Sequence, residues 1–129
     1  CGNVGLYWSA VYAYVYPAPS DQRLKDNIQD SALGLSFIDS LRPVSYNWKT
    51  PGPHTATQYG LIAQEVESVI GTNDFAGLMY NAENDSYSMV YTQFIAPMIK
   101  AIQELSTKNN QLELALAALM ARVDALEHV

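Results

Sequence analysis

The last third of the chain carries a regular repeat of apolar residues, and this repeat limits the fold more than any other feature. From residue 95 to residue 126, apolar side chains recur at alternating steps of three and four, which defines the a and d positions of a heptad repeat. Nine of these ten positions are apolar and one is Asn: Ile95, Met98, Ile102, Leu105, Asn109, Leu112, Leu116, Leu119, Val123 and Leu126. The pattern predicts a long coiled-coil helix that begins with Thr92 as its N-cap.

The width of the apolar stripe indicates how many helices meet. Ile or Val at a, Leu at d and a buried Asn are typical of two strands. Apolar residues at e and g widen the stripe beyond a two-stranded seam: Ile99, Ala101, Ala115 and Met120. A wider stripe favours three or more chains, or packing against the protein's own globular part. We expect a trimer, and the alternative is a monomer whose helix folds onto its own domain.

The charges beside the seam indicate the direction of the helices. Lys108 at g precedes Glu113 at e by five residues, and Arg122 at g precedes Glu127 at e by the same step. This is the spacing of cross-chain pairs in a parallel coiled coil. The sequence therefore predicts a parallel arrangement.

The chain before this helix has the patterns of a small α+β domain. Residues 6–16 alternate between two faces and are rich in aromatic and β-branched side chains, which predicts a strand that ends at Pro17 and Pro19. A helix is expected to start at Ser20, because Ser is a good N-cap and Asp21 follows in the first turn.

The middle of the chain alternates between helix and strand signals. Leu33, Phe37, Ile38 and Leu41 have helical spacing, and Pro43 ends that helix. The remaining segments predict a strand in VSYNW, a polar loop over 49–58, a strand and then a helix in YGLIAQEVESVIG closed by Gly71, and a hairpin formed by AGLMY and YSMVY around NAENDS. We expect three regions: the end of a preceding β-rich region in 1–19, an α+β domain in 20–91 and the coiled-coil helix in 92–129.

Composition disfavours several classes of function. The net charge is −6, with 7 basic against 13 acidic residues and no basic cluster, so a nucleic-acid partner is not expected. The longest apolar run is far shorter than the roughly 20 residues that span a bilayer, so no membrane association is expected. His54 and His128 lie far apart and lack metal-ligand spacing, and neither a metal nor a cofactor is predicted. The single Cys1 cannot form an internal disulfide, and the start without Met suggests a piece of a longer polypeptide without its own signal peptide.

Ser20 and Lys25 allow two interpretations. In the first, Ser20 only caps a helix and Lys25 is a solvated lysine, since residues five apart do not stack on one helix face. In the second, Lys25 is the base that activates the Ser20 hydroxyl as a nucleophile against the carbonyl of Pro19. That chemistry needs a lysine whose pKa is lowered by burial or by a neighbouring cation. It would cut the chain between Pro19 and Ser20.

Four segments together resemble a known family. These are SDQRLKDNI, LRPVSYNW, YGLIAQEV and a C-terminal coiled coil beginning APMIKAIQEL. In order and spacing they resemble the C-terminal intramolecular chaperone of phage tail spikes and fibres, the endosialidase-type peptidase S74 family, which also occurs in membrane-tethered myelin regulatory factors. The resemblance covers residues 17–127, and residues 1–16 look like the end of the preceding spike or fibre.

The resemblance implies roles for individual residues. The family's nucleophile falls on Ser20 and its dyad lysine on Lys25. Four further residues match motif positions and are expected to support the site: Asp21, Arg23, Gln64 and Glu65. For Gln64 and Glu65, capping and packing of the second helix is the alternative.

The resemblance also implies a function. The chain would trimerise and register the upstream spike or fibre region of the same chain, its folding client, in the host cytoplasm during phage assembly. It would then release itself by autoproteolysis between Pro19 and Ser20, as a single-turnover peptidase, and leave the client on the virion. The alternative from another class is a permanent trimerisation foot that is never cut. A fragment of a tethered transcription factor lacks support, because no basic segment or membrane span is present.

Overall fold

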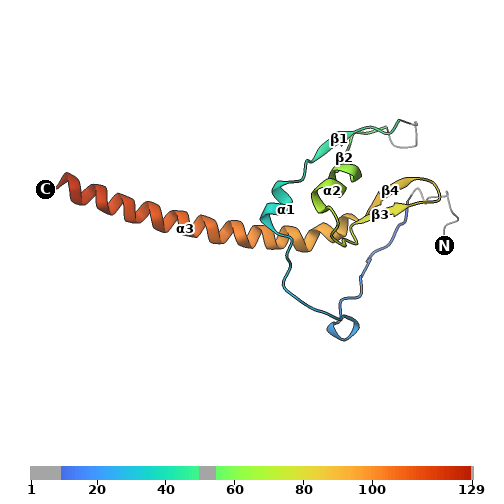
Figure 1. The fold of residues 1–129 in the computed structure, drawn as a ribbon, viewed down its shortest axis with the longest axis horizontal. Coiled ribbons are helices and arrows are strands. Elements are labelled where there is room, and N and C mark those ends of the chain that lie inside the picture. The colour runs from blue at the N-terminus through green and yellow to red at the C-terminus, as the bar shows by residue number, and fades with distance from the viewer. Residues whose placement is uncertain (1–9, 50–54, 129) are drawn as a thin grey trace. The chain divides into compact units, whose positions relative to one another are not determined.

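The computed structural model describes residues 10–49 and 55–128, so Cys1, residues 6–9 and His54 lie outside the described residues. By internal contacts the chain divides between residues 30 and 31 into two units. Each unit is described by itself. Figure 1 traces the elements of the chain from the N-terminus to the C-terminus.

The first unit contains one short regular element among its described residues, the 3₁₀ turn η1 (Gln22–Leu24). Residues 10–16 form no strand, although their alternation predicts one. A strand needs a neighbour for its backbone N–H and C=O groups, and none pairs with this segment within the described residues. The helix expected from Ser20 is also wrong, because the chain leaves the turn at Lys25 in an extended conformation.

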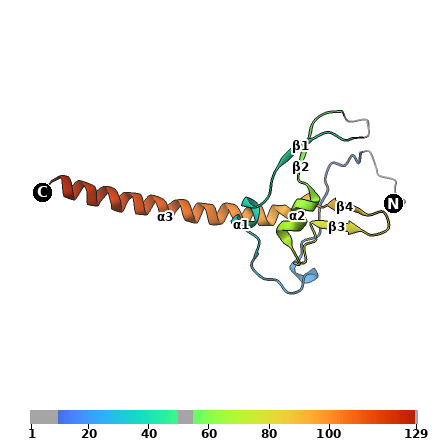
Figure 2. The same cartoon turned by 45° about the horizontal axis from the view of Figure 1, so that its top comes forward.

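The second unit confirms the α+β prediction. Its elements in chain order are α1 (Leu35–Asp39), β1 (Val44–Tyr46), β2 (Gln58–Gly60), α2 (Ala63–Ile70), β3 (Leu78–Asn81), β4 (Ser86–Met89), the 3₁₀ turn η2 (Tyr91–Phe94) and α3 (Ile95–Glu127). The strands form two separate antiparallel pairs, β1 with β2 and β3 with β4. Figures 1 and 2 show α2 and both strand pairs around the start of α3.

Local signals explain where these elements end. The helix α2 ends at Gly71, whose φ of 64° and ψ of −125° suit glycine and few other residues. At the tip of the β3–β4 hairpin, the Asn81 side chain accepts a hydrogen bond from the Glu83 N–H at 2.9 Å, and Asp85 has a positive φ of 49°. Asn and Asp tolerate such conformations, so the predicted hairpin forms where its turn residues lie.

A small aromatic core joins α1, α2 and the start of α3. Phe37, Val66, Ile70 and Phe94 form its buried cluster, and Phe75 packs against it. The rings of Phe75 and Phe94 meet edge to face with centroids 5.2 Å apart. Such aromatic pairs contribute about 0.5–1.5 kcal/mol beyond the burial of their surface. The core therefore holds α1 and α2 against η2, directly before α3.

The helix α3 confirms the predicted long C-terminal helix. Its 33 residues extend about 50 Å at 1.5 Å per residue. It begins at Ile95, and the expected cap Thr92 lies instead in the preceding 3₁₀ turn. Pro97 is tolerated in the first turn because its missing N–H would have no partner within the helix.

One face of α3 packs on the rest of the unit. Pro97 and Ala101 are the buried residues of the helix, and α1 packs against α3. A side chain at Gly34, just before α1, would meet Lys100 and Glu104 of α3, so the glycine permits this close approach. Ala101 at a g position thus packs within its own chain. Within the described residues, no helix is both long enough and apolar enough to cross a bilayer.

Candidate functional site

Asp21 and Arg23 build the turn that follows Ser20. The Asp21 carboxylate accepts a hydrogen bond from the Arg23 backbone N–H at 2.9 Å and from two guanidinium nitrogens, the shortest at 2.7 Å. The Arg23 side chain thereby lowers the pKa of Asp21, because it stabilises the charged carboxylate. Asp21 is therefore the N-cap of this turn, and the assignment of that role to Ser20 is wrong.

The turn brings Ser20 and Lys25 together. Lys25 Nζ donates a hydrogen bond to Ser20 Oγ at 2.8 Å, although five residues separate the two in the sequence. Such a pair would not stack on a regular helix. Here Ser20 precedes the cap, and η1 closes a single turn through the bond from the Lys25 N–H to the Gln22 carbonyl at 3.1 Å. Asn27 follows with a left-handed φ of 53°, so the chain bends again after Lys25.

Both members of this pair are exposed in the single chain. In the observed hydrogen bond the lysine is the donor. To act as a base, the lysine must be present as the neutral amine. The hydrogen-bonded pair can support transfer of the Ser20 hydroxyl proton to Lys25 once both side chains are shielded from solvent.

Gln64 and Glu65 lie at the start of α2 in the second unit. The Glu65 carboxylate accepts from the Arg42 guanidinium through both of its oxygens, with Nε to Oε2 at 3.1 Å. Hydrogen bonding to Arg42 lowers the pKa of Glu65. The backbone carbonyl of Gln64 accepts from the Ser68 hydroxyl at 3.1 Å, and its side chain is exposed.

Sequence reasoning did not single out Arg42. It belongs to the segment LRPVSYNW, while Glu65 belongs to YGLIAQEV, so the ion pair links two of the segments that carry the resemblance. The two residues are 23 positions apart, and a contact at that distance leaves no local pattern. The sequence signal for this ion pair is limited to the opposite charges of Arg42 and Glu65 inside two motif segments.

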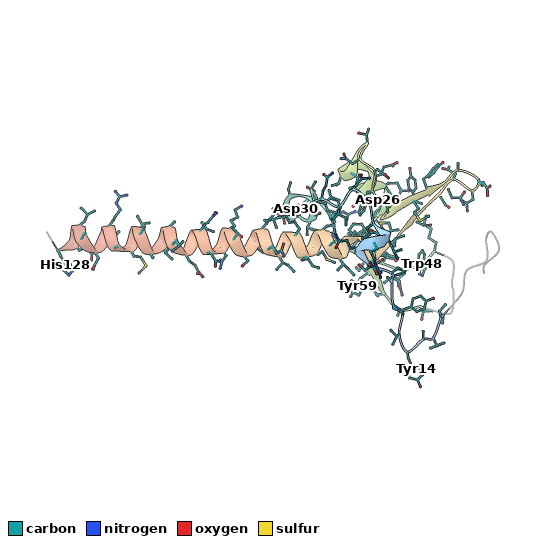
Figure 3. All side chains as sticks on the ribbon, turned by 90° about the horizontal axis from the view of Figure 1, so that it is seen from below. Tyr14, Asp26, Asp30, Trp48, Tyr59 and His128 are labelled. Atoms are coloured by element: carbon teal, nitrogen blue, oxygen red, sulfur yellow. The ribbon has the colours of Figure 1, made fainter. Side chains whose placement is uncertain are left out.

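The predicted seam residues lie along the face of α3 that its own unit leaves uncovered. The nine apolar members are each between 43% and 74% exposed. Figure 3 shows that no other element of this unit lies beside the outer part of α3. Ala101 and Pro97 are buried in the unit, so α3 separates a face for its own domain from an apolar face open to solvent.

Metal ligands are not gathered within the described residues, where no group of three His, Cys, Asp or Glu side chains could hold an ion. His128 lies at the C-terminal end of α3.

Ser20 and Lys25 lie in hydrogen-bond contact at the start of the segments that carry the resemblance. The family model of the chaperone of endosialidase, peptidase S74, matches residues 20–75. That range begins at Ser20 and includes Lys25, Arg42 and Glu65, and it ends before α3. Over these residues the chain is similar to this family, and the match supports an intramolecular chaperone role.

Proposed function

We propose that the chain is the self-releasing folding aid of a phage tail spike or fibre. Three copies associate through α3, hold three upstream client regions in register, and then cut between Pro19 and Ser20. The observation that carries the cutting step is the 2.8 Å hydrogen bond from Lys25 Nζ to Ser20 Oγ, at the first residue of the segment matched by the family model. The family's name as a peptidase supports the same chemistry.

In the proposed reaction, one proton moves from the Ser20 hydroxyl to Lys25 and then to the amide nitrogen. Neutral Lys25 takes the hydroxyl proton of Ser20, and Oγ attacks the carbonyl carbon of Pro19. The C–N bond of the Pro19–Ser20 peptide breaks, and the amide nitrogen receives the proton from Lys25. The resulting ester is hydrolysed by water to a Pro19 carboxylate and a free Ser20 hydroxyl. In direct scission without the ester, water attacks the same carbonyl and gives the same two products.

Exposure of the pair supports a link between assembly and cutting. A lysine ammonium group cannot accept a proton, so Lys25 can act as the base only as the neutral amine. Association of the client regions would desolvate the junction and favour the neutral amine. Cutting would then follow assembly, and the cut client would be protected by its barrier to unfolding.

The exposed apolar face of α3 supports the assembly step. Coiled-coil association raises the local concentration of the three client regions and sets their register. This helps because β-rich structures depend on contacts between distant residues, which form slowly. The client is the upstream region of the same chain. We place the events in the host cytoplasm, with the mature client on the virion.

Two substitutions test the cutting step. Ser20→Ala removes the nucleophile and Lys25→Ala removes its base, so each should leave the full-length chain as one band on a denaturing gel. Wild-type protein should give a fragment whose mass and first residue correspond to a start at Ser20. Lys25→Arg serves as a control that keeps the charge but cannot act as a base at neutral pH, and it should also remain uncut.

Two results would contradict the dyad. One is a Lys25→Ala protein that cuts at the wild-type rate. The other is a wild-type protein that stays intact after its client has assembled, which would favour a permanent trimerisation foot instead.

A further inference from the structure

Asn109 interrupts the apolar seam of α3. It is the one polar residue among the ten a and d positions, and it lies exposed near the middle of the repeat. Its side-chain Nδ2 donates a hydrogen bond to Glu113 Oε1 at 3.4 Å, one turn further along the helix. Glu113 occupies an e position, so this bond connects the seam to its charged edge.

The Asn109 amide needs partners that an apolar layer cannot supply. The bond to Glu113 uses one N–H, and a primary amide has a second N–H and an acceptor oxygen as well. Once a seam closes, water no longer reaches these groups, and a buried amide without partners is unfavourable. In a parallel assembly in register, equivalent residues lie in one layer. Asn109 of each copy then meets Asn109 of the others, and each amide offers both a donor and an acceptor.

A change of direction or register removes this partner. If one helix is reversed with full overlap, each a residue falls beside a d residue, and Asn109 falls beside Leu112. A parallel shift by one heptad places it beside Ile102 or Leu116. The layers without Asn109 remain apolar in every one of these arrangements. Asn109 is therefore the seam residue that distinguishes them.

The charges at the edge of the seam have a smaller effect on direction. The expected pairs of Lys108 with Glu113 and of Arg122 with Glu127 suit parallel chains, but these side chains are exposed. Each exposed ion pair changes an equilibrium constant by about fivefold at most. A buried amide without a partner changes it by about five- to 150-fold. The larger contribution per residue thus comes from Asn109.

We propose that Asn109 restricts the seam to parallel chains in register, and that the Asn109 amides of three copies form one hydrogen-bonded layer edged by Glu113. This inference rests on the proposed coiled coil and names the residue that sets its direction. A reversed helix would carry its own domain to the opposite end of the seam, about 50 Å away. Its client region could not join the other two. Asn109 lowers the stability of the seam and selects its direction.

Asn109→Ile tests this role in full-length protein with three further changes. Ser20→Ala prevents cutting, Cys1→Ser removes the natural thiol, and His128→Cys takes a spin label at the end of α3 that Figure 3 labels. In the parent the labels of all copies lie together, and pulsed electron spin resonance should give a single short distance. Asn109→Ile should add a second distance of about 50 Å from reversed chains. The ratio of long to short distances should rise at least about fivefold.

The melting temperature of the assembly separates direction from stability. Asn109→Ile should raise it, because isoleucine suits an a position. Asn110→Ile is the matched control, since Asn110 is the neighbouring exposed residue at a b position outside the seam. It should keep the single short distance of the parent.

The outcomes distinguish this inference from the proposed assembly. If the parent gives the short distance and Asn109→Ile gives only that distance too, the role of Asn109 is wrong and the coiled coil stands. If the parent already gives the long distance, or stays monomeric at all concentrations, the proposed parallel assembly is wrong and this inference fails with it.

Discussion

Asp21 and Arg23 shape the turn that brings the side chains of Ser20 and Lys25 into contact. Asp21 caps the turn and Arg23 holds its carboxylate, so the first turn is closed without any contribution from the Ser20 hydroxyl. That hydroxyl is bonded by Lys25 instead. A residue that caps a helix has its side-chain oxygen engaged by backbone N–H groups. Because Asp21 is the cap, the Ser20 hydroxyl can contact Lys25, as the proposed dyad requires.

The Arg42–Glu65 pair predicts a pH dependence of stability. Because its pKa is lowered in the folded protein, the Glu65 carboxylate stabilises the fold fully above its ordinary pKa of about 4.3. This stabilisation is lost as the pH falls through the lowered pKa. The melting temperature of wild type should therefore fall more steeply than that of Glu65→Gln between neutral and strongly acidic pH.

The control for this experiment is Glu83→Gln, at the exposed tip of the β3–β4 hairpin. It should follow the wild-type melting curve at each pH. Equal acid sensitivity in wild type and Glu65→Gln would mean that the ion pair does not contribute to stability.

At the residue scale, the sequence indicates contacts between near neighbours better than contacts between distant residues. Ser20 and Lys25 lie in hydrogen-bond contact, and their catalytic roles stay a prediction. The cap was misassigned, because Ser and Asp are equally good caps and stand next to each other. Arg42 was missed, since its partner is distant in the sequence.

Among the elements, α3 has two faces with different neighbours. Pro97 and Ala101 pack within the unit, and the a and d residues remain exposed. An apolar stripe of this length is unfavourable in water unless a partner covers it. The helix is therefore the element on which the proposed assembly would depend.

Replacing Leu112 and Leu119 by Asp should abolish the trimer. Each change would place an unpaired charge in the proposed seam, at a cost of about 3–5 kcal/mol per site. Light scattering should show the mass of three chains for wild type and of one chain for the double variant. The matched control is Leu114→Asp, because Leu114 is 73% exposed on the same helix but lies at an f position outside the seam. A wild-type mass of one or two chains would refute the trimer.

Helices and strands are predicted poorly from the sequence where they depend on contacts with residues far away in the chain. The β3–β4 hairpin was predicted well, because its turn residues and both strands are adjacent. Residues 10–16 alternate like a strand but have no pairing partner among the described residues. The helix expected after Ser20 is one 3₁₀ turn, since the chain leaves helical conformation at Lys25 and Asn27.

For the whole molecule, cutting and folding should be separable. The core lies between Phe37 and Ala101 and the seam lies on α3, so Ser20→Ala touches neither. Loss of one exposed hydroxyl should change stability by no more than about 0.5 kcal/mol. The variant should trimerise and deliver a folded client that remains attached to its chaperone.

That attached client should also unfold more reversibly, because the tethered helices keep the three chains together for refolding. The comparison is the heat or detergent resistance of the spike trimer, cut wild type against Ser20→Ala. A misfolded Ser20→Ala client would mean that cutting drives folding, and the proposed order of events would be reversed.

The separation of the two faces of α3 has a consequence for partner choice, when one cell makes several related proteins of this kind. The residues that hold the helix to its own domain, Pro97 and Ala101, are not those that would choose a partner. Substitutions along the exposed face can therefore change partner choice while each chain keeps its fold. Two such proteins could diverge in a shared host, and avoid mixed trimers, through seam changes alone.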